Sequence, residues 1–165
     1  MTRSKELLMR WEEMNAFSPL FRSHEGNQPT RSVQFDADDE LLMHLARMTK
    51  VHVALRDYIK DCTAYNISKG VPVMRPLFYH YDEPKAYTEM YEYLLGRDIL
   101  VAPVIDEGAL RRTVYLPDDR WVHLFTGEEF SGGTHTVESP IGYPPVFIRK
   151  DSTYVNELIS KISRI

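Results

Sequence analysis

Apolar residues recur at a helical spacing near the beginning of the chain. Across residues 4–17 they fall on one face of a helix, at Leu7, Leu8, Trp11, Met14 and Phe17. Ser4 is suited to cap this helix, and Pro19 ends the pattern. Residues 20–22 follow as a short apolar-to-polar run, which we expect to form a brief buried strand before a polar loop.

A longer helical repeat covers residues 36–70. Asp36 is the expected N-cap, and the acidic residues that follow it suit the positive end of a helix dipole. Apolar residues then continue at a period of about 3.6 residues. Gly70 stands where a C-cap glycine ends a helix, and Pro72 prevents the helix from resuming. This pattern predicts one continuous helix.

After Gly70 the pattern changes to short runs rich in β-branched and aromatic residues. The runs that predict strands are residues 73–79, 91–95, 99–104, 113–116, 121–125, 134–138 and 146–149. Turn residues separate them, for example at 96–98 and at 117–119. Short strands at such near-regular spacing predict an antiparallel β-sandwich, and residues 154–162 predict a terminal helix.

Composition and charge narrow the class of protein. The 165 residues are 43% hydrophobic, which is enough for a packed core, and the formal net charge of −4 argues against a nucleic-acid or anionic membrane surface. A single cysteine, Cys62, excludes an internal disulfide and fits a reducing compartment. The charged N-terminus does not resemble a signal peptide, and no apolar run reaches the roughly 20 residues of a membrane span. We therefore expect a cytoplasmic protein.

The carboxylates do not form an evident catalytic pair. Catalysis by paired carboxylates needs two of them that face each other across the substrate, whereas those that stand out here look like helix-start, helix-face or turn residues: Glu12, Glu13, Asp36, Asp38, Asp39, Asp118 and Asp119. His44 and His52 lie eight residues apart on one predicted helix, which is not the i, i+4 spacing of metal ligands. We expect them to be packing residues, and we expect no metal, no cofactor and no catalytic residue in this chain.

The polar loop after the first helix contains the strongest candidate for ligand binding. His24 lies between Arg22 and Glu25, just after a short apolar run. At the C-terminal end of a barrel strand, such a cluster would face a ligand. The alternative is that Arg22 and Glu25 form a local ion pair beside His24, and the residues alone leave the two interpretations equally open.

Several segments, in the same order, resemble glycoside hydrolase family 31. They are residues 10–24 (RWEEMNAFSPLFRSH), 70–77 (GVPVMRPL) and 93–104 (YLLGRDILVAPV), followed by Tyr115-Leu116-Pro117 and Trp121. Within that family, residues 22–29 (RSHEGNQP) with residues 34–36 (QFD) most resemble the sulfoquinovosidases. General α-glucosidases and α-xylosidases of the family usually share the Arg and the His but differ after them.

The resemblance implies an α/β plus all-β fold. Residues 1–70 would form the C-terminal end of a catalytic (β/α)8 barrel, and residues 71–165 would form the proximal antiparallel β-sandwich with its terminal helix. The implied partner is the missing N-terminal barrel. Without it the Trp11 and Leu45 faces would be exposed, so the chain could form a homo-oligomer.

The implied activity is the retaining hydrolysis of α-sulfoquinovosides such as sulfoquinovosyl glycerol. The resemblance places an Asp nucleophile and an Asp acid/base upstream of this chain, so the chain alone would be inactive. It also implies that His24 hydrogen-bonds sugar hydroxyls, that Arg22 orients the loop and that Glu25 accompanies them. Two alternatives remain: another α-glucosidase or α-xylosidase of the family, or, for the isolated chain, a non-catalytic β-sandwich module that acts only in support.

Overall fold

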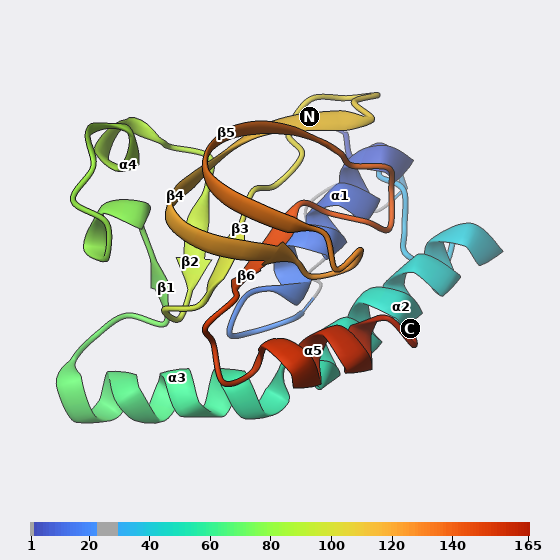
Figure 1. Ribbon diagram of the computed structural model, residues 1–165. Helices are drawn as coiled ribbons and strands as arrows, with labels where there is room; N and C mark the ends of the chain where they lie inside the picture. Colours follow the sequence, from blue (N-terminus) through green and yellow to red (C-terminus); the bar gives the residue numbers. More distant parts are fainter. Residues whose placement is uncertain (1, 23–29) are drawn as a thin grey trace.

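A computed structural model describes residues 2–22 and 30–165 of the chain (Figure 1). Its elements in chain order are α1 (Lys5–Ala16), α2 (Asp39–Ala54), α3 (Arg56–Lys69), β1 (Met74–Arg75), the 3-10 helix η1 (Leu77–Tyr79), α4 (Pro84–Thr88), β2 (Tyr93–Leu95), β3 (Ile99–Val101), β4 (Arg111–His123), β5 (Glu129–Glu138), β6 (Val146–Arg149) and α5 (Val155–Ile162). The fold therefore combines helices with one antiparallel sheet. Within the described ranges no helix is both long enough and apolar enough to span a bilayer.

The first helix forms where the apolar pattern predicts it. Ser4 caps α1, because its side-chain oxygen accepts a hydrogen bond from the amide of Leu7 at 3.2 Å. The strand expected at residues 20–22 does not form, and Leu20 is 68% exposed. A lone three-residue run has no neighbouring strand with which to share its backbone hydrogen bonds, so this prediction was wrong for the chain as it stands.

The long helix expected over residues 36–70 is interrupted. It begins two residues later, with Asp38 rather than Asp36 as the N-cap, and it divides at Leu55 into α2 and α3. Leu55 is fully buried, and the interruption lets α2 and α3 each turn a separate apolar face toward the same core. Gly70 ends α3 in a left-handed conformation, φ 69°, which confirms the predicted C-cap.

The strands form one six-stranded sheet with the order β1-β2-β3-β6-β4-β5, and every pair is antiparallel. The turn expected at residues 117–119 is absent, because the run at 113–116 and the first three residues of the run at 121–125 belong to the single strand β4. Between Leu116 and Arg120 the register of β4 against β5 shifts, so the turn-like residues form an irregularity within a strand. The run at 73–79 also divides, into β1 and η1.

The central strands of the sheet are buried on both faces, whereas β5 is mostly exposed. Neighbouring residues on one strand point to opposite faces, so Ile99 and Leu100 enter two different cores. The first core packs the sheet against α1, α2, α3 and α5, and the second packs it beneath the curved β4–β5 hairpin (Figure 1). The first core draws on both halves of the chain, since Phe17 and Met48 share it with Val146.

The predicted exposure of two helical faces is only partly correct. Trp11 and Leu45 are half-buried rather than exposed. The exposed apolar side chains on the same helices are their neighbours Leu7, Leu42 and Met43, at 47%, 49% and 68%.

Candidate functional site

Of the three candidate substrate-binding residues, the structure describes Arg22. Its side chain is exposed, and its carbonyl oxygen accepts a hydrogen bond from the Nδ2 of Asn15 at 3.3 Å. His24 and Glu25 lie outside the described residues. The choice between a ligand-facing His24 and an Arg22–Glu25 ion pair therefore stays a prediction.

The chain that leads into this segment is held by side chains from α2 and β2. The hydroxyl of Tyr93 lies 3.2 Å from the carbonyl oxygens of both Met14 and Phe17, and the Nδ1 of His52 lies 2.9 Å from the carbonyl oxygen of Ala16. The last carbonyls of a helix have no partner within the helix. Tyr93 and His52 satisfy these carbonyls and so fix the end of α1 against the body of the protein.

Two further contacts hold the residues just after α1. The hydroxyl of Ser18 donates to the carbonyl oxygen of Asn15 at 2.8 Å. The ring of Phe21 lies against that of His52, with centroids 5.5 Å apart, and packs on the first core. Phe21 is thus anchored one residue before Arg22.

The N-terminal end of α1 is held to Val33, a residue that follows the candidate loop in the sequence. Arg3 donates from Nε and Nη2 to the carbonyl oxygen of Val33, at 2.9 and 2.7 Å, and the amide of Val33 donates to the carbonyl oxygen of Arg3 at 3.0 Å. Since α1 has 12 residues, its two ends lie about 18 Å apart. Arg22 and Val33 are therefore held at opposite ends of one helix.

Two adjacent carboxylates on α1 are buried, but they face different partners. The carboxylate of Glu13 accepts from Nη1 of Arg10 at 3.1 Å and from the amide of Gly142. Glu12 lies 4.0 Å from the Nε2 of His44, and burial raises its pKa to about 7. Neighbouring residues on a helix do not face each other, so Glu12 and Glu13 do not form the facing pair that glycoside hydrolysis requires.

Both histidines on α2 make packing contacts, as predicted. His44 is buried, and its Nε2 lies 3.1 Å from the carbonyl oxygen of Met9. Cys62 on α3 is also buried, and burial raises the pKa of its thiol, which suits a structural residue rather than a nucleophile. In the part of the chain that the structure describes, no group of three or more His, Cys, Asp or Glu side chains could hold a metal ion.

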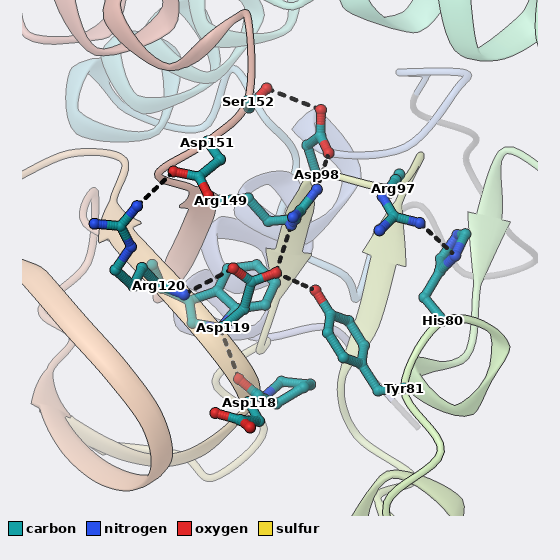
Figure 2. Close-up of polar contacts among 12 residues, drawn as sticks. His80, Tyr81, Arg97, Asp98, Asp118, Asp119, Arg120, Arg149, Asp151 and Ser152 are labelled. Atoms are coloured by element: carbon teal, nitrogen blue, oxygen red, sulfur yellow. Dashed lines mark hydrogen bonds and ion pairs between the residues drawn. The ribbon is translucent and has the colours of Figure 1, made fainter.

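A second pair of carboxylates shares one guanidinium (Figure 2). Arg149 donates from Nε to Asp119 at 2.6 Å and from Nη1 to Asp98 at 3.3 Å. Tyr81 donates its hydroxyl hydrogen to Asp119, and Ser152 donates to the other oxygen of Asp98 at 2.8 Å. These contacts join the turn before β3, the irregularity in β4, the end of β6 and the approach to α5, so the two aspartates are structural.

A groove of about 570 Å³ runs between the first part of α1 and residues 103–107. Its walls are mostly apolar, with Leu7 and Trp11 on one side and Ile105 on the other. One of its three carboxylates, Glu6, already accepts hydrogen bonds from the amide of Gly108, at 2.9 and 3.0 Å, and the other two are Asp106 and Glu107. The groove is therefore better suited to packing against protein than to chemistry on a polar ligand.

The sequence around Tyr93 and His52 carries no pattern that predicts their contacts with α1. Tyr93 is 79 positions from Met14 in the sequence, and His52 is 36 positions from Ala16. The periodicity of apolar residues cannot predict contacts between residues so far apart in the sequence. The only available signal was that Tyr93 begins one of the segments that resemble a known family.

The chain is similar to known proteins over most of its length. Residues 70–153 match the glycosyl hydrolase family 31 C-terminal domain. Over 155 residues the chain is 57% identical to the sulfoquinovosidase of Escherichia coli (strain K12) and 49% identical to that of Agrobacterium fabrum (strain C58 / ATCC 33970). These matches cover 93% and 92% of the chain.

A solved structure gives the same result in three dimensions. It is a GH31 family sulfoquinovosidase from E. rectale in complex with the aza-sugar inhibitor IFGSQ, and it is similar to this chain with a TM-score of 0.95 and 46% sequence identity. The match covers 99% of this chain and 24% of that one. The chain likewise spans 23% of the length of each of the two curated relatives.

Proposed function

Because the chain belongs to glycosyl hydrolase family 31, we propose that it forms the C-terminal part of a retaining α-glycoside hydrolase that cleaves α-sulfoquinovosides such as sulfoquinovosyl glycerol. The observation that carries this proposal is the 57% identity to the Escherichia coli sulfoquinovosidase over 93% of the chain. A second sulfoquinovosidase, from Agrobacterium fabrum, supports it at 49%. The alternative substrates are the plain α-glucosides and α-xylosides that other members of the family would take.

In this proposal residues 1–70 are the C-terminal end of a (β/α)8 barrel, and residues 71–165 are the proximal β-sandwich with its terminal helix. Two observations support the division. The match to the family's C-terminal domain begins at residue 70. The central strands also have the two buried faces of a sandwich, because the β4–β5 hairpin covers the face that the helices leave open.

The contribution of this chain to catalysis is to shape part of the sugar site. We assign His24 to hydrogen bonds with sugar hydroxyls, Arg22 to orienting the loop and Glu25 to a supporting contact. Hydrogen bonds that strengthen in an oxocarbenium-like transition state lower the barrier as well as improve binding. The anchoring of the end of α1 by Tyr93 and His52 supports this assignment, since a group that acts on a transition state must be held in place.

The nucleophile and the acid/base belong, in the same proposal, to polypeptide outside these 165 residues. This is consistent with the share of each curated relative that the chain spans, 23%. The carbohydrate substrate and the remainder of the barrel are the partners that follow from it. We further propose a cytoplasmic location, which the single, buried Cys62 supports.

The test uses the complete enzyme that contains this chain. We expect His24→Ala to lower kcat/KM on an aryl α-sulfoquinovoside by roughly 10- to 100-fold, the loss of one or two hydrogen bonds to the sugar. His135→Ala is the matched control, because His135 lies on β5 and its Nε2 contacts the carbonyl oxygen of Ser131 at 2.9 Å. An unchanged value for His24→Ala would remove His24 from the substrate site.

Substrate class is tested separately, with the same leaving group on two sugars. The complete enzyme should hydrolyse the aryl α-sulfoquinovoside with a much higher kcat/KM than the aryl α-glucoside. Faster hydrolysis of the plain glucoside or of the α-xyloside would support the alternative within the family.

For the chain alone, the remaining alternative is a non-catalytic support module. Calorimetric titration with sulfoquinovose distinguishes a chain that carries a complete sugar site from one that carries only part of it. We expect no measurable heat. A saturable heat would mean that the 165 residues bind the sugar without the rest of the barrel.

A further inference from the structure

Two arginines converge on one histidine beside the turn between β2 and β3. Arg75 ends β1, His80 follows η1, and Arg97 lies in the turn. The Nη1 of Arg75 lies 2.7 Å from the Nε2 of His80, and the Nη1 of Arg97 lies 3.5 Å from the Nδ1 of the same ring. Figure 2 shows the guanidinium of Arg97 pointing at the imidazole.

The ring cannot accept a hydrogen bond from both arginines. A neutral imidazole has one N–H donor and one acceptor nitrogen, whereas guanidinium groups only donate. Burial, with Arg75 and Arg97 next in effect, lowers the pKa of His80 to about 4, so the ring is neutral at pH 7. The close contact to Arg75 assigns the acceptor to Nε2, and the hydrogen is then on Nδ1.

His80 Nδ1–H and Arg97 are therefore two donors that face each other across 3.5 Å. Such an arrangement is stabilised by an acceptor beside both groups, a place that water or an anion can fill. Arg97 has no carboxylate within 4.0 Å among the residues that the structure describes, and its side chain is exposed. The pair is thus open to an acceptor that comes from solution.

The acidic side chains that lie beside Arg97 and His80 in the sequence are occupied elsewhere. Asp98 accepts hydrogen bonds from Arg149 and Ser152 through its two oxygens. Asp82 accepts from the hydroxyl of Tyr87 at 2.9 Å. Arg75, Arg97 and Arg149 all lower the pKa of His80, and Asp98 is the acidic group that opposes them. The local charge around His80 is therefore positive.

Arg75 is held rigidly behind the histidine. It is 4% exposed, and its Nε donates to the carbonyl oxygen of Pro72 at 2.6 Å. The rings of Tyr65 and Tyr79 flank its guanidinium, with centroids 5.8 and 5.7 Å away. Because these contacts hold Arg75 at Nε2, they favour one orientation and one tautomer of the ring before any ligand arrives.

We propose that Arg97 and the Nδ1–H of His80, with Arg75 behind them, form a binding site for a small oxyanion such as phosphate, sulfate or a sulfonate. One oxygen of the anion accepts from Nδ1–H of His80, and the same or a second oxygen accepts from the guanidinium of Arg97. Charge-assisted hydrogen bonds of this kind are short and stronger than neutral ones. The site does not depend on the proposed glycosidase activity, and none of its members is a residue assigned to the sugar.

Equilibrium dialysis of the full chain against labelled inorganic phosphate, labelled sulfate and labelled methanesulfonate tests the site, whatever the oligomeric state of the chain. We expect saturable binding that Arg97→Gln weakens by roughly 10-fold or more, since it removes a charge-assisted bond. Arg120→Gln is the matched control, because Arg120 is an exposed arginine in the same region that pairs with Asp151 at 2.8 Å. This control should bind as the unaltered chain does.

The three anions separate the sources of the ligand. Preference for phosphate would point to a phosphorylated metabolite, and preference for methanesulfonate would point to a sulfonated one. Absence of saturable binding to all three, or equal binding by Arg97→Gln and the unaltered chain, would overturn the proposal.

Nitrogen-15 NMR of histidine-labelled chain gives an independent readout. We expect the His80 signals of the Nδ1–H tautomer at pH 7, and a change in the Nδ1 shift when the anion is added. The Nε2–H tautomer, or a shift that Arg97→Gln leaves unchanged, would contradict the proposed geometry.

Discussion

Tyr58 and Gly96 lie so close that a Cβ atom on Gly96 would fall 2.4 Å from the hydroxyl oxygen of Tyr58. That hydroxyl donates to the carbonyl oxygen of Leu95 at 2.7 Å and accepts from the amide of Asp98 at 3.0 Å. Gly96 also has a φ of 63°, in the left-handed region that favours glycine. One phenol of α3 therefore fixes the turn between β2 and β3 from both sides.

We expect Gly96→Ala to lower the free energy of unfolding of the chain by about 3 kcal/mol, from a left-handed alanine and an overpacked contact together. Urea denaturation followed by circular dichroism measures the loss. Gly127→Ala is the matched control, because Gly127 has a φ of 74° and nothing within 4 Å of the added Cβ. It should lose only about 1–2 kcal/mol, and equal losses at the two positions would mean that the contact with Tyr58 is not tight.

Arg149→Met should destabilise the chain by about 2–3 kcal/mol, because it leaves Asp98 and Asp119 side by side without their shared cation. Thermal unfolding at low and high salt measures the effect. Arg120→Met removes an exposed ion pair with Asp151, so it should lose less than about 1 kcal/mol. The same small loss for both substitutions would show that the Arg149 network adds no stability.

Glu92 predicts a specific dependence of stability on pH. Burial raises its pKa to about 7, and its Oε2 is buried without a hydrogen-bond partner among the described residues. A carboxyl group with a raised folded-state pKa contributes stability that is fully present below its unfolded pKa, about 4.3, and is lost as the pH rises through 7. Glu92→Gln should therefore gain stability relative to the unaltered chain as the pH rises. Between pH 4.5 and pH 8, the difference in free energy of unfolding between the two proteins should change by roughly 2–3 kcal/mol in favour of Glu92→Gln.

The comparison between the two proteins isolates this effect. The pKa values of His80 and His123 are lowered to about 4 by burial, so both histidines change stability in the opposite direction between about pH 4 and 6.5. They are present in both proteins and cancel in the difference, as does Glu12, whose pKa is raised like that of Glu92. Denaturant unfolding from pH 4.5 to 8 gives the measurement, and a difference that stays constant across this range would contradict the assignment to Glu92.

The groove beside α1 predicts self-association of the chain. Leu7 and Ile105 are 47% and 50% exposed there, and exposed apolar surface of this kind is normally covered by protein. We expect dimers or larger species in sedimentation velocity, and fewer of them with Ile105→Lys. Ile67→Lys is the matched control, because Ile67 is exposed on α3 outside the groove. A clean monomer for the unaltered chain would contradict the prediction.

Local signals in the sequence predicted the features that depend on neighbouring residues. Ser4, Gly70 and the terminal apolar repeat place α1, the end of α3 and α5 where they are found. The interruption at Leu55 could not be predicted, because apolar residues continue at helical spacing across it. The helix divides there for a tertiary reason, which is that both of its parts contact the same core.

The turn-like residues within β4 are a case in which the local sequence predicts the wrong structure. Pro117 and Asp118 have the composition of a loop, yet they lie in the middle of a strand, where Asp118 donates its amide hydrogen to Glu83 and Trp121 donates to the carbonyl oxygen of Pro117. Glu83 is 35 residues from Asp118, so the sequence around Asp118 carries no sign of it. The predicted substrate-binding residues are a different case. His24 was predicted from its loop and its family resemblance, and of Arg22, His24 and Glu25 the structure describes Arg22 alone.

The strand order has a consequence for synthesis on the ribosome. β6 lies between β3 and β4, although it is the last strand to be made. Until Val146–Arg149 emerge, the nascent chain can form only two separate sheets, β1-β2-β3 and the β4–β5 hairpin, and each has one additional edge that β6 later covers. The sheet is then completed in a single step by four residues, so translation that stalls before residue 146 would release a chain with two edges open to pairing with other molecules.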